Sequence, residues 1–248
     1  MQSAIVLEHV TKRFGDTVAV RDLSLSIAPG AFVGLLGRNG AGKSTTLKML
    51  TGLLAPTSGT IRLLDQKFDE HALEIKRRIG VMPEDMALLE MLTGPQYLRF
   101  VGRMYGLEDD VVDARRAELF EKLDLQPGAR TVIADYSFGM KKKVALSAAL
   151  LHGPEVLFLD EPFEGIDPVT SRTIKDILAA LRRRGTTILL TSHILEIVEK
   201  LCEEIAILEK GDLLGFGTLE ELRKGTTLEA AFVELVGGAR AGELSWLA

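Results

Sequence analysis

The chain has 248 residues, of which 46% are hydrophobic and 26% are charged, and its formal net charge at pH 7 is −5. This composition is typical of a globular protein, and its acidic balance argues against a dedicated nucleic-acid binder, which normally carries a basic field. The single cysteine, Cys202, excludes an intrachain disulfide and a metal cluster built on several thiolates. No apolar run approaches the roughly twenty residues of a membrane-spanning helix, so we expect a protein that is soluble or that reaches a membrane through a partner.

The N-terminal segment predicts antiparallel strands. Apolar and polar residues alternate along three stretches, which the turn sequences FGD and APG separate: residues 4–10, 17–27 and 32–37. The third of these strands leads into a glycine-rich loop and then a helix.

Beyond this loop, strand patterns alternate with helix patterns, which predicts a parallel α/β core. The expected strands are 60–64, 79–83, 156–160 and 186–193, followed by a hairpin over 204–218. The expected helices are 71–78, 93–106, 109–125, 144–151, 167–185, 194–202, 219–222 and 228–236. Two basic runs, KKK at 141–143 and RRR at 182–184, are interpreted as solvated helix faces or helix ends.

The loop after the third strand carries the most specific motif. Residues 37–45 read GRNGAGKST, which matches the pattern G-x-x-x-x-G-K-[ST] between an apolar strand and a helix. Glycines let the backbone approach an anion closely, and N–H groups at the start of the helix point towards phosphates. Lys43 would place its charge near the β- and γ-phosphates, and the Ser44 hydroxyl would bind Mg²⁺. The predicted nucleotide-binding residues are Gly37, Arg38, Asn39, Gly40, Ala41, Gly42, Lys43, Ser44 and Thr45.

A second motif, VLFLDEP at residues 156–162, is an apolar strand that ends in two carboxylates. At a strand end beside the phosphate loop, Asp160 would hold Mg²⁺ directly or through water. Glu161 would then polarise the water that attacks the γ-phosphate. Alone this pattern is weak, because strands often end in acidic residues, but the upstream phosphate loop makes the functional interpretation specific.

With YSFGMKKK at 136–143, GIDP at 165–168 and a histidine after TILLTS, these motifs stand in the order found in ATP-binding cassette (ABC) ATPases. From about residue 5 to residue 232 the sequence resembles that family. Its YS-x-GMKKK motif is similar to that of ATP-binding subunits of bacterial ABC-2-type exporters, whose membrane half is a separate chain.

This resemblance implies an α/β fold, with a P-loop NTPase core around a parallel sheet, an antiparallel β subdomain and an α-helical subdomain. The ABC ATPase domain would span residues 1–232, and the helical subdomain, including the signature motif, would span 90–150. Residues 233–248 would form a C-terminal tail, of which residues 237–248, GGARAGELSWLA, are expected to be loose.

The resemblance also implies roles for further residues. Phe14 is similar to the aromatic residue that stacks on adenine, with a core aromatic as the alternative. Asp167 matches a loop aspartate at the interface between two subunits. His193 matches the switch histidine at the γ-phosphate, so Glu161 and His193 would be the catalytic pair. The signature motif, which acts on the nucleotide of a partner subunit, is matched by Ser137, Phe138, Gly139 and Met140.

One position departs from the family pattern. Glu84, in VMPED, stands where the family has a glutamine in the loop that couples the nucleotide to the membrane partner. A carboxylate can still bind Mg²⁺ or its water, but its negative charge near a triphosphate needs an offsetting cation. We expect Glu84 to contact the metal or the attacking water.

For function, the resemblance implies an ATPase that uses ATP and Mg²⁺ to energise export by a separate integral membrane permease. Two subunits would dimerise head to tail, as a homodimer or pseudo-dimer, with each ATP between one phosphate loop and one signature turn. The chain would be cytoplasmic, held at the inner face of the membrane by the permease, and would bind no nucleic acid. A short permease helix would enter a groove of the helical subdomain, unless that segment is a simple structural insertion.

Two other functions are compatible with the same motifs. One is a soluble single-cassette ABC ATPase that acts in an assembly complex rather than in transport. The other is a nucleotide-binding module without turnover, which the presence of both Glu161 and His193 disfavours.

Overall fold

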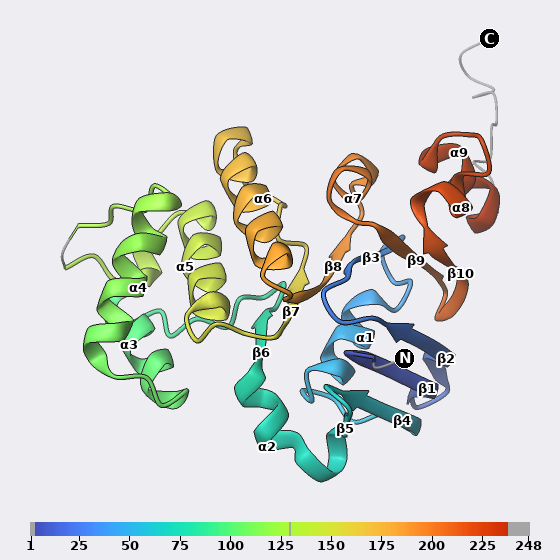
Figure 1. The fold of residues 1–248 in the computed structure, drawn as a ribbon, viewed down its shortest axis with the longest axis horizontal. Helices are drawn as coiled ribbons and strands as arrows, with labels where there is room; N and C mark the ends of the chain where they lie inside the picture. Colours follow the sequence, from blue (N-terminus) through green and yellow to red (C-terminus); the bar gives the residue numbers. More distant parts are fainter. Residues whose placement is uncertain (1–2, 129, 238–248) are drawn as a thin grey trace.

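The computed structural model describes residues 3–128 and 130–237, and two sheets form its centre (Figure 1). The smaller sheet has the strand order β2-β1-β4-β5 and is antiparallel throughout. Its strands are β1 (Ile5–Phe14), β2 (Thr17–Ile27), β4 (Ser58–Leu63) and β5 (Gln66–Lys67). The antiparallel pairing predicted for the first two strands is confirmed.

The larger sheet has the strand order β10-β9-β3-β8-β7-β6. Neighbouring strands from β9 to β6 are parallel, and β10 runs antiparallel to β9 as the predicted hairpin. Its strands are β3 (Phe32–Gly37), β6 (Ile79–Met82), β7 (Val156–Asp160), β8 (Thr187–Ser192), β9 (Glu204–Glu209) and β10 (Asp212–Thr218).

The prediction that the third strand pairs antiparallel with the first two is wrong. This strand, β3, pairs in parallel with β8 and β9 in the larger sheet. All its residues are buried, so both of its faces are covered, as is typical of a parallel sheet between helical layers. The sequence FVGLLG lacks polar alternation, and this continuous apolar run is the feature that distinguishes it from the amphipathic strands before it.

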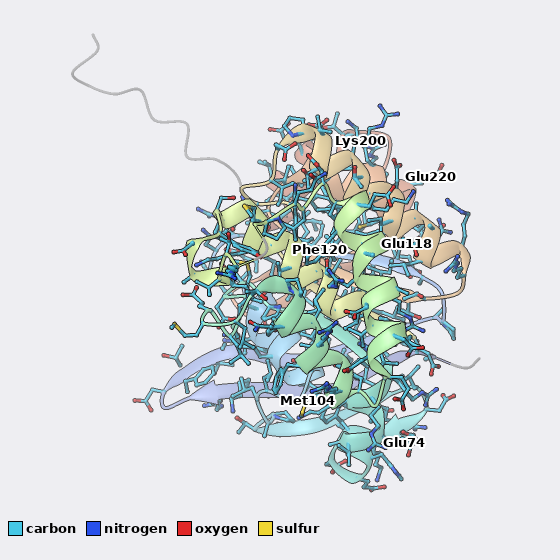
Figure 2. All side chains as sticks on the ribbon, turned by 90° about the vertical axis from the view of Figure 1, so that its left-hand side faces the viewer. Glu74, Met104, Glu118, Phe120, Lys200 and Glu220 are labelled. Atoms are coloured by element: carbon cyan, nitrogen blue, oxygen red, sulfur yellow. The ribbon has the colours of Figure 1, made fainter. Side chains whose placement is uncertain are left out.

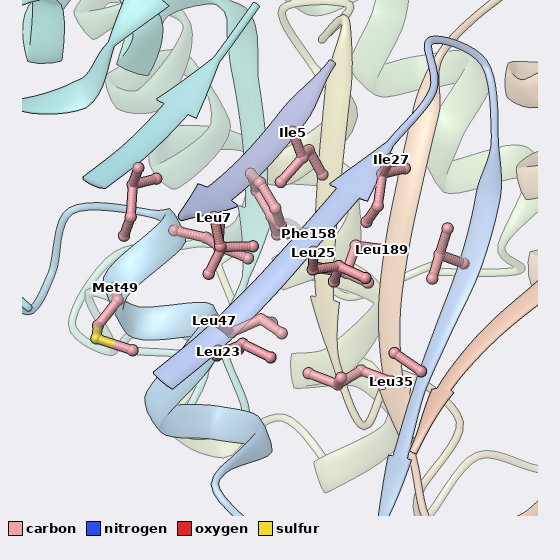
Figure 3. Close-up of a cluster of buried hydrophobic side chains, with 14 of the residues drawn as sticks. Ile5, Leu7, Leu23, Leu25, Ile27, Leu35, Leu47, Met49, Phe158 and Leu189 are labelled. Carbon is pink, nitrogen blue, oxygen red and sulfur yellow. The ribbon is translucent and has the colours of Figure 1, made fainter. Parts of the chain in front are cut away.

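Helices cover the larger sheet and also build a separate lobe (Figure 1). One apolar cluster lies between the two sheets and helix α1, and it includes Leu7, Leu47 and Phe158 (Figure 3). A second cluster on the opposite face of the larger sheet joins it to α5, α6, α7 and α9. The helices are α1 (Lys43–Leu50), α2 (Phe68–Arg78), α3 (Gly94–Met104), α4 (Asp109–Lys122), α5 (Phe138–Leu150), α6 (Pro168–Arg183), α7 (Leu195–Leu201), α8 (Leu219–Arg223) and α9 (Leu228–Val236), with a 3₁₀ turn at Ile133–Asp135.

The helical lobe consists of α3, α4 and part of α5, and Figure 2 views it from its outer side. Its own apolar core includes Leu98, Val112 and Phe120. Helices α3 and α4 approach closely at Gly102, where a Cβ atom would lie 2.2 Å from Cγ2 of Val112. The helices predicted over 93–106 and 109–125 are confirmed, and the lobe is joined to the rest of the chain through α5.

Helix α9 continues to Val236, past the boundary predicted at residue 232. The domain boundary predicted at residue 232 therefore falls inside the helix predicted over 228–236, and the segment predicted as loose, 237–248, lies outside the described residues from residue 238 on. Across residues 3–128 and 130–237, none of the helices combines the length and apolar character needed to cross a bilayer.

Candidate functional site

The phosphate loop joins the end of β3 to the start of α1. Gly40 and Gly42 have φ values of +80° and +105°, which residues with a side chain rarely adopt. A Cβ atom on Gly42 would also lie 2.6 Å from the backbone oxygen of Ala19. Glycine is therefore required at Gly42 by both conformation and space, and the loop can turn tightly in front of the N-terminus of α1.

Lys43 is the first residue of α1 and is buried. Its Nζ atom donates hydrogen bonds to the backbone oxygens of Gly37 at 2.8 Å and Arg38 at 3.3 Å. The loop thus holds the ammonium group against its own backbone. A positive charge and the free N–H groups of a helix start lie together, which is an arrangement that binds phosphate.

Three oxygen-bearing side chains meet beside Lys43. The Ser44 hydroxyl lies 3.4 Å from Oδ1 of Asp160, at the end of β7, and 3.5 Å from Oε2 of Glu84, in the loop after β6. In the part of the chain that the structure describes, no cluster of three or more His, Cys, Asp or Glu side chains could hold a metal by itself. One hydroxyl and two carboxylates nevertheless fit Mg²⁺, which usually takes one or two carboxylates and completes its shell with water and phosphate oxygens.

Glu161 follows Asp160 directly and is also buried. Its carboxylate Oε2 lies 3.0 Å from Nδ1 of His193, which follows β8 and is half-exposed. The backbone of Glu161 has φ = +47°, a value that is unfavourable for a residue with a side chain. The structure thus brings the predicted catalytic pair into direct contact at the carboxyl ends of β7 and β8, the edge at which parallel sheets bind ligands.

These groups face one cavity of about 690 Å³, a size suited to a ligand such as a nucleotide. Its walls include residues 39–45 of the phosphate loop together with Glu84, Glu161 and His193. On the other side it is lined by residues 17–19, at the start of β2. Phe14 is half-exposed at the end of β1, a few residues away, with Nζ of Lys12 at 5.2 Å from its ring centre. Its exposure argues against the core-aromatic alternative.

The signature turn lies elsewhere. Ser137 is the N-cap of α5, and its Oγ atom accepts a hydrogen bond from the N–H of Met140 at 3.2 Å. Ser137 and Phe138 are exposed, and Gly139 and Met140 are partly exposed. Among the described residues that line the phosphate-loop cavity, none belongs to this turn. The predicted signature residues are therefore not brought to the nucleotide site of their own chain.

Asp167 has a role within its own chain. It is the N-cap of α6, and its Oδ1 accepts hydrogen bonds from the N–H groups of Val169 at 3.0 Å and Thr170 at 2.9 Å. The hydrogen bonds from Thr170 hold the pKa of Asp167 below its ordinary value. Its predicted place at an interface between subunits stays a prediction.

Sequence reasoning missed two residues of the site. Thr191, on β8, is fully buried and contacts both Asp160 and Glu161; its hydroxyl next to Ser192 at the end of an apolar strand was the available signal. Lys142 is also buried, so interpreting the whole KKK run as a solvated face was wrong. Helix α5 packs against both the larger sheet and the core of the helical lobe, so its surface is covered on more than one side and the middle lysine is buried. The arginines at 182–184 are exposed at the end of α6, as predicted.

Comparison with known sequences identifies relatives of this chain. The family model described as ABC transporter matches residues 20–164. The chain is 39% identical over 215 residues to the linearmycin resistance ATP-binding protein LnrL of Bacillus subtilis, covering 87% of this chain and 69% of LnrL. It is 38% identical over 224 residues to the daunorubicin resistance ATP-binding protein DrrA3 of Streptomyces coeruleorubidus, covering 90% and 71%. The Nod factor export ATP-binding protein I of Cupriavidus metallidurans is 36% identical over 222 residues, covering 90% and 73%.

Solved structures confirm the predicted fold class. An ATP-binding subunit of an ABC transporter matches with a TM-score of 0.88 at 30% identity, covering 94% of this chain and 99% of that one. A dimeric ATP-binding cassette in a post-hydrolysis state, bound to ADP and Pi, matches with a TM-score of 0.79 at 25% identity, covering 86% and 98%. On the evidence of its sequence relatives and its fold, the chain belongs to the ABC transporter family, as an ATP-binding subunit that hydrolyses ATP.

Proposed function

We propose that the chain energises export by a separate integral membrane permease, which holds it at the inner face of the membrane. The observation that carries this proposal is the division of the site. The phosphate loop, Glu161 and His193 share one cavity, while the exposed signature turn lies outside its described lining. The hydroxyl and N–H groups of this turn can bind phosphate, but they lie outside the described lining of the nucleotide cavity of their own chain. The turn is therefore suited to the nucleotide of a second subunit.

Two subunits would meet head to tail, each ATP lying between the phosphate loop of one and the signature turn of the other. The Ser137 hydroxyl and the free N–H groups at the start of α5 would then face the γ-phosphate. ATP would form part of the interface, and its hydrolysis would let the subunits separate. The permease would follow this opening and closing.

Within each site, the residues of this chain would divide the work of hydrolysis. Lys43 and the N–H groups of the phosphate loop hold the β- and γ-phosphates. Glu161 orients and polarises the attacking water and is positioned to take its proton. His193 bonds to the Glu161 carboxylate and reaches the γ-phosphate from the exposed side of its ring.

Magnesium would lie among Ser44, Asp160 and Glu84, with phosphate oxygens as its other ligands. When bound, Mg²⁺ neutralises charge on the β- and γ-phosphates. Glu84→Gln keeps an oxygen ligand but removes its charge, so the Mg²⁺ concentration that gives half-maximal turnover should rise by about threefold to tenfold. Asp85→Asn, an equivalent change at the next residue, is the control and should leave it unchanged. Unaltered Mg²⁺ dependence and unaltered turnover in Glu84→Gln would contradict this role.

Exposed apolar side chains on the helical lobe and the adjoining segments support a docking surface for the permease. Large apolar side chains are exposed there: Leu73 on α2, Leu89 and Met91 in the loop that follows Glu84, and Phe100 and Met104 on α3. Exposed apolar groups in such numbers mark interaction sites. An amphipathic helix is a partner of suitable shape. The loop with Glu84 would connect this surface directly to the nucleotide.

The direction of transport is inferred from the relatives. LnrL and DrrA3 are named for resistance to linearmycin and daunorubicin, and a third relative is named for Nod factor export. Removal of a compound from the cell would explain all three names. We extend export to this chain on that basis.

Co-purification from membranes tests the proposal. Tagged wild-type chain should carry an integral membrane protein with it, and that protein should increase its ATPase rate. Met91→Glu with Met104→Glu places charges on the proposed surface and should abolish co-purification but leave ATP binding intact. Val233→Glu, on α9, is the matched control and should co-purify normally. Recovery of the wild-type chain only with soluble proteins would contradict the proposal and favour an assembly complex.

A further inference from the structure

Lys142 is a buried cation at the centre of the molecule. It lies on α5, two residues after Met140 of the signature motif, and only 2% of its surface is exposed. Lysine is almost never buried to this extent unless it is paired. Its Nζ atom donates a hydrogen bond to the backbone oxygen of Glu161 at 2.6 Å and lies 3.9 Å from Oε2 of Glu164. The burial of Lys142 is therefore explained by its contact with the segment that carries Glu161.

The backbone of Glu161 needs such a contact. Its φ of +47° is strained for a residue with a side chain, and strained residues persist where neighbours fix them from several directions. The N–H of Glu161 donates to Oγ1 of Thr191 at 3.0 Å, and its oxygen accepts from Lys142. Both polar groups of this peptide segment are thus held by side chains from other elements, β8 on one side and α5 on the other.

The charge of Lys142 suits its surroundings. Burial lowers the pKa of Lys142, and the carboxylates of Glu164, Glu161, Glu84 and Asp160 oppose that shift, with Glu164 contributing most. These acidic groups surround a site that must also receive a triphosphate. The ammonium group adds a positive charge to this acidic surrounding, and its ion pair is with Glu164 at 3.9 Å.

Lys142 also touches the signature turn of its own chain. Its Nζ lies 5.1 Å from the centre of the Phe138 ring. The same ring packs on Gly165, where a Cβ atom would lie 2.7 Å from Cδ1 of Phe138. The start of α5, Lys142 and the segment after β7 therefore form one contiguous contact.

We infer that Lys142 is a positioning residue that links the signature turn to Glu161 of the same subunit. When the signature turn engages the partner's nucleotide, α5 and Lys142 set the Glu161 backbone, and with it the carboxylate that polarises water. Each subunit thereby senses the nucleotide of its partner through its own α5. This inference rests on the proposed role of Glu161 and on the split site.

The test compares length-matched lysine variants of the full chain, in the assembly that shows wild-type turnover. Lys142→Met keeps the length of the side chain but removes the donor and the charge. Its kcat should fall by about tenfold or more, because a small misplacement of a catalytic group has a large cost. Its KM for ATP, its ATP affinity and its melting temperature should stay close to wild type. Lys142→Arg restores a charged donor and should recover most of the turnover.

Lys143→Met is the matched control, since its Nζ bonds to the backbone oxygen of Asp124 in the helical lobe instead; its kcat should equal that of wild type. Wild-type turnover in Lys142→Met would overturn the inference. So would a loss of turnover accompanied by an equal loss of ATP affinity or thermal stability. Either result would leave the turnover of the wild-type chain and of Lys143→Met unchanged, so it would contradict the inference about Lys142 alone. Absence of ATP turnover in the wild-type chain would instead contradict the proposed function.

Discussion

Thr191 shows how one small side chain organises the catalytic edge of the sheet. Its hydroxyl donates a hydrogen bond to Oδ1 of Asp160 at 2.5 Å and accepts one from the N–H of Glu161 at 3.0 Å. A hydroxyl can act as donor and acceptor at once, so this residue fixes two consecutive functional residues from the neighbouring strand. A valine in its place would remove this acceptor from the buried N–H of Glu161, and Asp160 Oδ1 would keep the longer hydrogen bond from the Ser44 hydroxyl, at 3.4 Å.

His152 leads to a prediction about how the stability of the fold depends on pH. Its ring stacks on Tyr105, with ring centres 3.7 Å apart, and its Nε2 donates to the backbone oxygen of Ile79 at 3.0 Å. Its buried Nδ1 has no hydrogen-bond partner among the residues that the structure describes. Burial lowers the pKa of His152 to about 4, so the unfolded chain binds a proton between that value and about 6.5 while the folded chain does not. The stabilisation that His152 provides is therefore complete above about pH 6.5. As the pH falls towards 4, the free energy of unfolding decreases by about 1 to 3 kcal/mol.

Urea unfolding at a series of pH values measures this effect. The free energy of unfolding of the wild-type chain, minus that of His152→Gln, should be constant above about pH 6.5 and fall below it. His71→Gln changes an exposed histidine on α2 and should follow the wild-type profile. A difference between wild type and His152→Gln that does not vary with pH would show that His152 is not held neutral by burial.

The residues that the sequence could identify are those whose chemistry depends on spacing along the chain. The phosphate loop and the acidic strand end have fixed spacings, and residues 39–45 and Glu161 line one cavity; among the described residues of that lining, Gly37, Arg38 and Asp160 are not included. Lys142 and Thr191 could not be assigned from spacing, because their partners come from other elements. Nothing in KKK reveals that the first lysine pairs with Glu90 and the second with a buried backbone oxygen.

At the scale of elements, α5 connects the two lobes. Val144 packs in the core of the helical lobe, while Ala145 and Leu146 pack against the larger sheet. One helix thus contributes to two cores, which explains why its sequence lacks a clear polar face. The hydrophobic pattern of the sequence predicts this helix but not its position between the two lobes. In the same way, the pattern predicted strand β3 but assigned it to the wrong sheet.

The N-terminus of α5 carries the next prediction. Ser137→Ala removes the helix cap and should lower stability by about 1 kcal/mol, whereas Ser137→Asn keeps a capping oxygen and adds bulk. Both variants should bind ATP like the wild-type subunit, because the turn lies outside the described lining of the phosphate-loop cavity. Both should lose turnover by about tenfold or more, since the turn would act on the partner's γ-phosphate. Loss of ATP binding by the isolated Ser137→Asn subunit would contradict the split-site account.

At the scale of the whole molecule, the residues proposed to act on ATP fall into two groups. Phosphate-loop residues 39–45, Glu161 and His193 line one cavity, whereas the signature turn at the start of α5 is not among the described residues that line it. In the proposed head-to-tail arrangement, a two-fold pairing of subunits would complete both sites at once. The central claim is therefore that ATP holds two copies of this chain together and that Glu161 ends this state.

Glu161→Gln tests this claim most directly, through the molar mass of the variant in solution with and without ATP. The variant keeps the size of the side chain but cannot accept a proton, so its turnover should fall by about a hundredfold or more. It should be monomeric without nucleotide and dimeric in saturating ATP with Mg²⁺. Glu161→Gln combined with Lys43→Ala, which weakens phosphate binding, should remain monomeric in both conditions. A Glu161→Gln chain that binds ATP yet stays monomeric, or that hydrolyses ATP at the wild-type rate, would contradict the account.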